Sequence, residues 1–227
     1  MAELIVALDL PDAPTAVELL DRLPDGCSVK VGSVLMTAAG PGFVRALVEA
    51  GHPVFRALKW HDIPNTVAGA VRAARVLGVE MATVHALGGR EMLEAAVDAA
   101  AGEVRLVAVT VLTSHDADSL GAVLGRRVDD TGPEVERLAG VAMAAGVAGV
   151  VCSPREIALV RSLVGGGRIV VPGIRRAGDA LGDQVRVAGP AEAVAAGATH
   201  LVVGRPITGA ADPAAAYAAF QGETTGR

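Results

Sequence analysis

The chain has 227 residues, a length that suits one large α/β domain, and a formal net charge of −5 at pH 7. Hydrophobic residues make up 52% of it and aromatic residues only 2%, so the core must be built from Val, Leu, Ile and Ala, as in buried parallel strands. The negative charge argues against a nucleic-acid-binding protein, because there is no surplus of basic residues to neutralise phosphates.

Short runs rich in β-branched residues alternate with Ala- and Leu-rich amphipathic stretches along the whole chain. The predicted strands are Leu4–Leu10, Ser28–Gly32, Pro53–Lys59, Met81–Ala86, Val104–Leu112, Gly149–Ser153, Ile169–Ile174 and His200–Arg205. The predicted helices are Ala16–Arg22, Gly42–Ala50, Asn65–Leu77, Arg90–Ala101, Pro133–Ala145, Pro154–Val164, Pro190–Ala196 and Pro213–Phe220. The last four of these helices begin at a proline, whose missing N–H costs nothing in the first turn.

Eight strand–helix units in this length predict a closed parallel barrel, an α/β fold of the (β/α)8 or TIM-barrel class, with residues 1–227 forming a single domain. An open doubly wound sheet is the main alternative. Such sheets usually carry a glycine-rich fingerprint after the first strand, whereas here that strand ends in Leu8-Asp9-Leu10-Pro11.

The cysteines and the apolar runs indicate in which cellular compartment the protein is expected. Cys27 and Cys152 fit neither a zinc nor a redox spacing, and we expect two buried structural thiols. No basic segment precedes the first apolar run, Leu4–Leu10, and no apolar stretch is long enough to cross a membrane. We therefore expect a soluble cytoplasmic protein that has no membrane partner.

Polar residues at the carboxyl ends of the predicted strands are candidate site residues, because the active site of a barrel forms at that end. Nine such residues in a chain this apolar indicate a site. They are Asp9, Lys30, Lys59, Asp62, His85, Thr113, Ser153, Arg175 and Arg205.

The third predicted strand carries the most distinctive charge. Alternation places residues 55, 57 and 59 on one face and Arg56 and Leu58 on the other. An inward-pointing lysine near the mouth of a barrel is costly unless a partner or a ligand meets it, although a lysine at the rim can also extend to water.

Two neighbouring charges favour a functional role for Lys59. Lys30 lies at another strand end, and Asp62 follows three residues after Lys59. A lysine in such a setting can hold and then protonate a carbanion, provided that nearby acids keep it charged and oriented. Asp9 could bind a sugar hydroxyl or orient Lys30.

The segments after the last two strands indicate a phosphate site. Pro172-Gly173-Ile174-Arg175 leads into a long loop with Gly182-Asp183-Gln184-Val185-Arg186, and the eighth strand ends in Val203-Gly204-Arg205-Pro206. Loops this long often close over ligands, glycine permits close approach, and arginine forks onto phosphate oxygens. The alternative is a helix cap with a surface arginine. We favour a phosphorylated metabolite anchored here and reacting near the second and third strands.

Taken together, these motifs resemble the bacterial branch of the orotidine 5'-monophosphate decarboxylase family. The resemblance spans nearly the whole chain, and the run Lys59-Trp60-His61-Asp62-Ile63-Pro64-Asn65-Thr66 and the two phosphate motifs are its most specific parts. The other matching segments are Ala7-Leu8-Asp9, Val29-Lys30-Val31-Gly32, His85-Ala86-Leu87-Gly88-Gly89 and Leu112-Thr113-Ser114.

The resemblance implies conversion of orotidine 5'-monophosphate to uridine 5'-monophosphate and carbon dioxide, without a metal or an organic cofactor. By position, Lys59 would be the proton donor, Lys30 and Asp9 would hold ribose hydroxyls, and Thr113 would lie against the pyrimidine. It also implies a homodimer in which Asp62 and Thr66 complete the partner's site. The residues implied for the phosphate are Arg175, Gln184, Gly204 and Arg205.

One position departs from the family pattern. Similar enzymes read Asp-x-Lys-x-x-Asp on this strand, and here the first position is Ala57, preceded by Arg56. Without that acid the pocket has an excess of positive charge. Such a pocket would bind the anionic substrate without raising the energy of its ground state. Tight binding of the ground state does not lower the activation barrier of decarboxylation, so we expect impaired turnover.

Two alternatives remain at this point. A related magnesium-using sugar-phosphate synthase or decarboxylase would need carboxylates where this chain has Lys30 and Ala57. A catalytically weakened or inactive homologue that binds pyrimidine nucleotide is supported by Ala57 alone. Turnover of orotidine 5'-monophosphate separates the possibilities.

Overall fold

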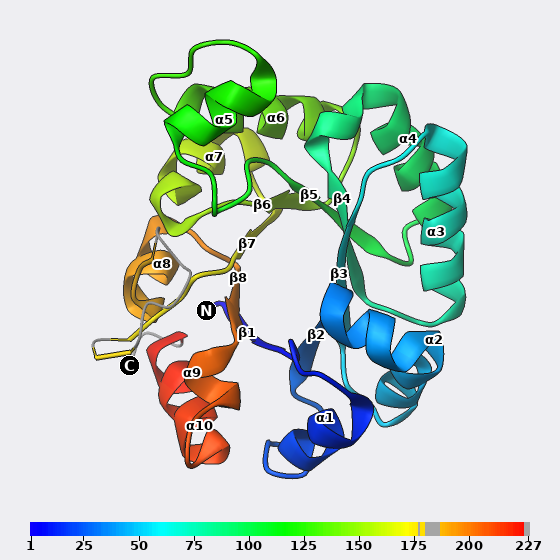
Figure 1. The fold of residues 1–227 in the computed structure, drawn as a ribbon, viewed down its shortest axis with the longest axis vertical. Coiled ribbons are helices and arrows are strands. Elements are labelled where there is room, and N and C mark those ends of the chain that lie inside the picture. Colours follow the sequence, from blue (N-terminus) through cyan, green and yellow to red (C-terminus); the bar gives the residue numbers. More distant parts are fainter. Residues whose placement is uncertain (177, 180–186, 225–227) are drawn as a thin grey trace.

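The computed structural model describes residues 1–176, 178–179 and 187–224, and in them eight parallel strands close into a barrel surrounded by helices (Figure 1). The strands follow one another around the barrel in chain order, and β8 pairs with β1 to close it. The predicted (β/α)8 fold is therefore confirmed.

The strands are β1 (Glu3–Ala7), β2 (Ser28–Gly32), β3 (Val54–Trp60), β4 (Met81–His85), β5 (Arg105–Val109), β6 (Gly149–Val151), β7 (Arg168–Val171) and β8 (His200–Val203). The helices are α1 (Ala13–Leu20), α2 (Ser33–Glu49), α3 (Pro64–Val76), α4 (Gly89–Ala100), α5 (Ala117–Leu124), α6 (Gly132–Ala144), α7 (Ile157–Val164), α8 (Pro190–Ala196), α9 (Arg205–Thr208) and α10 (Pro213–Thr224). Two single 3-10 turns, η1 (Ala86–Gly88) and η2 (Pro154–Glu156), follow β4 and β6.

The strand side chains divide between two apolar cores, because successive residues of a strand point to opposite faces. The larger core lies between the strands and the helices and includes Val6, Val54 and Ala82. The smaller core fills the barrel. It consists of Ile5, Ala7, Phe55, Ala57, Met81, Val107, Val170 and Val202. Aliphatic side chains thus make up most of both cores, as the composition predicts.

Most predicted strands are too long at their carboxyl ends. Leu4–Leu10 shortens to Glu3–Ala7, Val104–Leu112 to Arg105–Val109, and His200–Arg205 to His200–Val203. Apolar residues such as Leu8, Val111 and Leu112 follow these ends, but the chain leaves the sheet at the barrel rim, where ladder hydrogen bonds stop. Apolar sequence continues past the end of pairing, which is why a hydrophobic pattern misplaces the boundary.

Two helices and part of a third were not predicted. Helix α5 is capped at its start by Asp116, which forms a reciprocal cap with Ser119, and at its end by Gly125, which lies in the left-handed region. The prediction Gly42–Ala50 covers only the second half of α2, which starts at Ser33 and kinks at Gly40 (φ 70°). Helix α9 is a single turn after β8.

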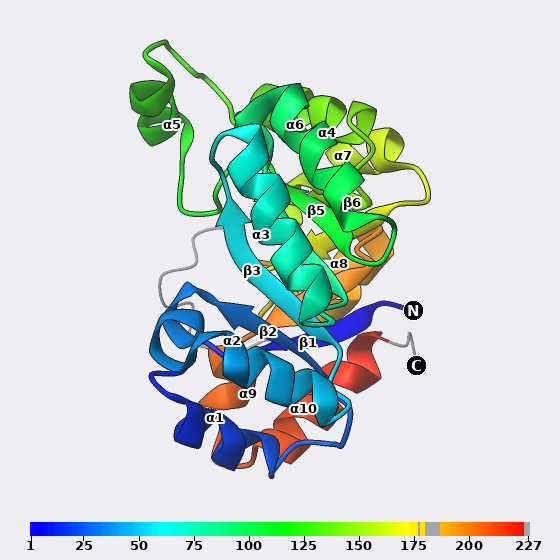
Figure 2. The ribbon, with the colours of Figure 1, turned by 90° about the vertical axis from the view of Figure 1, so that its right-hand side faces the viewer.

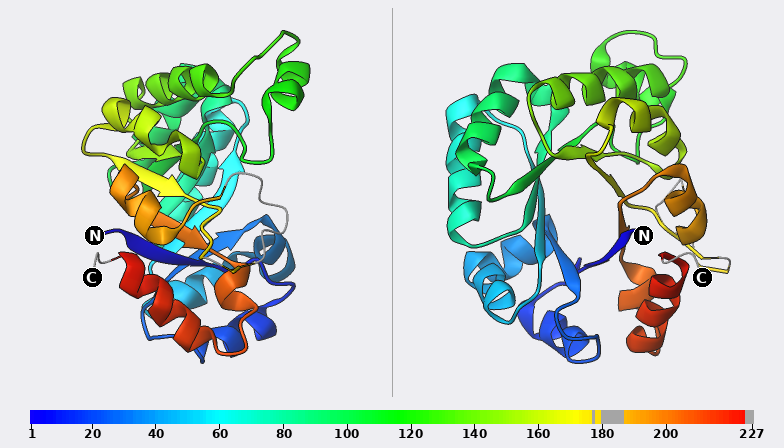
Figure 3. Two further views of the ribbon diagram at one scale, coloured as in Figure 1. Left: turned by 90° about the vertical axis from the view of Figure 1, so that its left-hand side faces the viewer. Right: turned by 180° about the vertical axis from the view of Figure 1, so that it is seen from behind.

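The α5 segment projects away from the barrel, beyond the helix layer (Figure 2). The same projection is visible from the opposite side in the left panel of Figure 3. The helices that cover the strands, by contrast, pack closely around the ring (Figure 3, right). Among the described residues, no helix has both the length and the apolar character needed to span a bilayer.

Both cysteines are buried free thiols, as predicted. Burial raises the pKa of the Cys27 thiol to about 11, with the nearby Asp25 carboxylate adding to the shift. This thiol therefore stays protonated and unreactive at neutral pH.

Candidate active site

A cavity of about 350 Å³ opens at the carboxyl ends of β1, β2, β7 and β8. Five predicted site residues line it: Asp9, Lys30, Arg175, Gly204 and Arg205. Of the other five lining residues, Pro172 and Gly173 belong to the predicted phosphate segment, whereas the sequence did not indicate Ala7, Val202 and Thr208 as site residues. Position in the barrel could have indicated Ala7 and Val202, whereas Thr208 follows the strand end by a helical turn and gives no sequence signal.

Asp9 and Lys30 form an ion pair on one wall of this cavity. The Lys30 Nζ donates to Asp9 Oδ1 at 2.7 Å, and the lysine side chain is only 14% exposed. Gly32, at the end of β2, leaves room for this pair, since a Cβ there would lie 2.7 Å from Asp9 Oδ1 and 3.0 Å from Lys30 Nζ. A charged pair is thereby fixed at the mouth of the barrel, where it can meet hydroxyl groups of a ligand.

Arg175 and Arg205 line the same cavity from the segments after β7 and β8. Arg175 is 8% exposed, and its Nη1 donates to the Ile174 carbonyl oxygen at 2.8 Å. Its backbone N–H donates to the Ala188 carbonyl oxygen at 3.0 Å, which joins the segment after β7 to the segment before α8. Arg205 is exposed and begins α9, directly after Gly204. Two cations and a glycine at one strand edge form a site that suits a phosphate group.

Strand β3 is irregular where it carries Lys59. Its register with β4 shifts between Arg56 and Trp60, and Lys59 has a φ of 52°, in the left-handed region that non-glycine residues rarely adopt. Such conformations cost of order 1–3 kcal/mol and cluster at functional sites. Alternation is confirmed for Phe55 and Ala57, which lie inside the barrel, but the shift prevents it from extending to Lys59.

Three surrounding features set the acidity of Lys59. Lys59 is exposed at the rim, but the protein around its ammonium group partly desolvates it and so lowers its pKa; repulsion from Lys30 lowers the pKa further, and Asp9 opposes the shift. Among the described residues, no carboxylate lies within ion-pair distance of Lys59. Ala57, two residues earlier, presents only a methyl group to the barrel interior and pairs with Gly32 across the strands. A lowered pKa makes the ammonium a better proton donor at neutral pH.

Arg56 faces the helix layer, as alternation predicts. It is 8% exposed, its guanidinium carbon lies 5.2 Å from the centroid of the Trp60 ring, and its Nη2 lies 3.9 Å from Met36 Sδ. Burial lowers its pKa. Because it points away from the cavity, Arg56 does not take the place of the acid missing at position 57.

Asp62 and Thr66 lie outside the cavity. Both are exposed, Asp62 just before α3 and Thr66 in its first turn, and Asp62 Oδ1 accepts the Ile63 N–H at 2.6 Å. Ile63 is 66% exposed. Within one chain the Asp62 carboxylate therefore accepts the next backbone N–H, and it forms no ion pair with Lys59.

Thr113 and Lys59, two predicted site residues, do not belong to the lining of this cavity. Thr113 is half-buried after β5 and is not among the residues that line it. Gln184 lies outside the described residues, so its predicted contact with phosphate stays a prediction.

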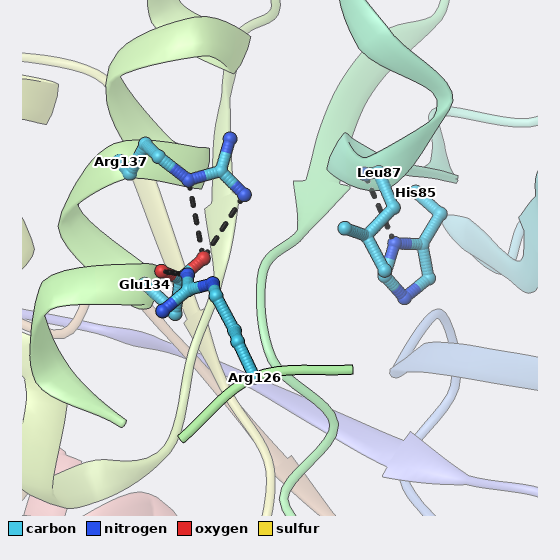
Figure 4. A network of polar contacts seen from close by, with 5 residues as sticks. All are labelled: His85, Leu87, Arg126, Glu134 and Arg137. Carbon is cyan, nitrogen blue, oxygen red and sulfur yellow. Dashed lines mark hydrogen bonds and ion pairs between the residues drawn. The ribbon is translucent and has the colours of Figure 1, made fainter. Parts of the chain in front are cut away.

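His85, at the end of β4, lies beside the lysine. Its ring stacks on His61 with centroids 5.4 Å apart, and its Nδ1 accepts the Leu87 N–H at 3.3 Å (Figure 4). Burial lowers its pKa to about 4, with further contributions from His61 and Lys59. The ring is therefore neutral at pH 7.

A second polar cluster lies across from His85 in Figure 4. The buried Glu134 carboxylate accepts hydrogen bonds from Arg126 and from Arg137, the latter at 3.0 and 3.1 Å. Burial alone would raise the pKa of Glu134, but the two arginines outweigh it and lower the pKa. This cluster ties the segment after α5 to the first turn of α6.

Comparison with known proteins identifies the family of this chain. Residues 2–220 match the family described as orotidine 5'-phosphate decarboxylase / HUMPS. The chain belongs to this family. It is 56% identical over 228 residues to the orotidine 5'-phosphate decarboxylase of Halorhodospira halophila, covering 97% of this chain and 94% of that protein. The protein of the same name from Alkalilimnicola ehrlichii is 54% identical, with coverage of 98% and 96%.

Solved structures agree with the sequence relatives. The crystal structure of orotidine 5'-phosphate decarboxylase from Lactobacillus acidophilus superimposes with a TM-score of 0.88 and 37% identity over 99% of both chains. The resemblance drawn from the motifs is therefore confirmed. This member of the family has the barrel fold of the solved structure and carries an alanine at position 57.

Proposed function

We propose that this chain decarboxylates orotidine 5'-monophosphate to uridine 5'-monophosphate in pyrimidine biosynthesis. The observation that carries the proposal is identity of 54–56% over nearly the full length to proteins named orotidine 5'-phosphate decarboxylase. The cavity supports it. Arg175 and Arg205 suit the phosphate group, the Asp9–Lys30 pair suits the ribose hydroxyls, and Lys59, whose pKa is lowered, suits proton donation.

Binding begins at the two arginines. Arg175 and Arg205 hold the phosphate with the backbone of Gly204, and Gln184 adds a contact from the loop after β7. Asp9 and Lys30, paired at 2.7 Å, hold ribose hydroxyls. Thr113 lies against the pyrimidine when the substrate is bound. Charge-assisted hydrogen bonds of this kind fix both register and orientation.

The chemical step then uses Lys59. The bond between the ring carbon and its carboxylate breaks, carbon dioxide leaves, and the electron pair stays on the ring carbon. Lys59 Nζ donates a proton to that carbon and becomes a neutral amine. The lowered pKa of this lysine supports the role, because the proton is released more readily than from an ordinary lysine. The balance needs no metal and no organic cofactor.

The active unit in this proposal is a homodimer in the cytoplasm. Asp62 and Thr66 reach the partner's site and place an acid next to the partner's lysine. Their exposure supports this arrangement, as does the exposure of the neighbouring apolar side chains Ile63 (66%) and Leu87 (41%). An interface that covers these residues would bury apolar area that is otherwise in contact with water.

The test is a direct assay of the fall in orotidine 5'-monophosphate absorbance, with uridine 5'-monophosphate binding measured by calorimetry. We expect turnover that a metal chelator does not reduce. Tight binding of uridine 5'-monophosphate without turnover would instead support the inactive homologue, and activity that needs magnesium would support the sugar-phosphate enzymes.

A further inference from the structure

Because of the irregularity in β3, three of its residues lie opposite a single residue of β4. The strands β3 and β4 pair at Arg56 with Ala82 and again at Trp60 with Val84, so β3 advances four residues while β4 advances two. Ala57, Leu58 and Lys59 therefore all lie opposite Thr83. Bulges of this kind interrupt the backbone ladder and redirect a side chain, and they are over-represented next to active sites.

A hydrogen bond to the Thr83 side chain takes the place of the backbone ladder hydrogen bond that is interrupted here. Its Oγ1 accepts the backbone N–H of Lys59 at 2.6 Å. Thr83 is 2% exposed, and its neighbours Met81 and Val107 belong to the core inside the barrel. The hydroxyl is thus a buried polar group in an apolar setting, and holding the Lys59 backbone is the contact that occupies it.

The conformation held in this way is an unfavourable one. Lys59 has a φ of 52°, and a strained residue keeps such a conformation only where its surroundings fix it. No carboxylate within the described part of the chain lies at ion-pair distance from the Lys59 ammonium group, and Ala57 offers no polar atom. The backbone contact is therefore the anchor that the structure shows for the direction of this side chain.

We propose that Thr83 is a positioning residue for Lys59, whose hydroxyl holds the left-handed turn that aims the ammonium group at the reacting carbon. The inference rests on the proposed decarboxylase function and adds a residue to it. Thr83 does not touch the substrate in this proposal and acts only through Lys59.

The first experiment compares three variants for kcat, KM and melting temperature. Thr83→Val keeps the shape and removes the hydroxyl, and Thr83→Ser keeps the hydroxyl. The matched control is Thr199→Val at the other end of the barrel, where Thr199 Oγ1 accepts the Ile169 N–H at 2.8 Å. We expect kcat of Thr83→Val to fall about 10- to 100-fold with little change in KM. Thr83→Ser and Thr199→Val should stay within a few-fold of the parent.

The second experiment does not depend on turnover. The sequence contains only two lysines, Lys30 and Lys59, so protein labelled with ¹³C-lysine gives two side-chain signals that a Lys30→Arg variant assigns. In Thr83→Val the Lys59 titration should move upward toward that of an ordinary lysine, because a released side chain leaves the burial and the repulsion that lower its pKa. Thr83→Ser should titrate like the parent.

The outcomes separate this inference from the proposed function. If the parent shows no turnover, the decarboxylase proposal fails, while the lysine titration still tests the role of Thr83. An unchanged Lys59 titration in Thr83→Val would overturn the positioning role. Equal losses of kcat in Thr83→Val and Thr83→Ser would also overturn it, since packing and not the hydroxyl would then be responsible.

Discussion

The two sides of the barrel mouth are built differently. On the phosphate side, formed by Arg175, Gly204 and Arg205, the residues follow strands that end regularly, and all three line one cavity. On the lysine side, formed by Ala57, Lys59 and Thr83, the strand is irregular, the lysine backbone is left-handed, and an alanine stands where the family resemblance implies an acid. Under the proposed function, the comparison teaches that the described phosphate-binding residues can share one cavity while the strand that carries the proton donor is altered.

Loss of Lys59 should give the largest effect on the lysine side. We expect Lys59→Ala to lower kcat by about 100- to 10,000-fold, the usual contribution of a positioned proton donor. Binding of uridine 5'-monophosphate, measured by calorimetry, should change little because the phosphate side is untouched. In the parent, kcat should decline as pH rises through the Lys59 pKa, which burial and Lys30 place below that of an ordinary lysine. A Lys59→Ala protein with parental turnover would refute the assignment.

Restoring the acid should have the next largest effect. Two unit charges about 4 Å apart interact by roughly 4 kcal/mol at an effective dielectric of 20. If part of that interaction separates the ground state from the transition state, Ala57→Asp should raise kcat by about 100-fold. Ala57→Asn is the matched control, because it has the same shape without the charge. Equal and fast turnover in parent and Ala57→Asp would show that position 57 does not limit the chemistry.

On the phosphate side the expected effect is on KM. Arg205→Ala should raise KM by about 10- to 100-fold, because a hydrogen bond to a charged group contributes about 1.5–3 kcal/mol. The control is Arg176→Ala, which removes a nearby arginine paired with Glu223 and absent from the cavity lining. Should both variants raise KM alike, the effect would be one of general charge and not of a phosphate contact.

The smallest effect concerns stability on the lysine side. The pKa of His85 is about 4 in the folded protein and about 6.5 for an unperturbed histidine. Between these values the unfolded chain binds the proton and the folded chain does not, so stability is lost as pH falls from 6.5 to 4. Allowing for partial solvent screening, we expect a loss of about 1–2 kcal/mol. Urea unfolding at several pH values should show a shallower dependence in His85→Gln than in the parent.

Much of the binding site could be predicted from the sequence. The sequence indicates Asp9, Lys30, Arg175 and Arg205 as polar strand-end residues and Gly204 as part of the phosphate motif, and all five line the cavity. The reason is geometric: in a parallel barrel every strand ends at the same rim, so residues far apart in the chain converge without further information. The strand bounds were less accurate, because apolar residues continue beyond the last ladder hydrogen bond.

The lysine side could not be predicted in the same way. Alternation correctly placed Ala57 inside the barrel and Arg56 outside it, but it assumes that each residue of β3 faces one residue of β4. The register shift breaks that assumption at Lys59. Thr83 gave no signal, since a threonine in a strand is ordinary.

The sequence by itself determined the barrel, the family and the residue types at the rim, because these follow from periodicity and from short motifs that act locally. The tertiary structure alone decided how Lys59 is held and how far Asp62 lies from it within one chain. Those features depend on which residues of two neighbouring strands face each other, and a two-residue difference in pairing leaves no mark on the hydrophobic pattern.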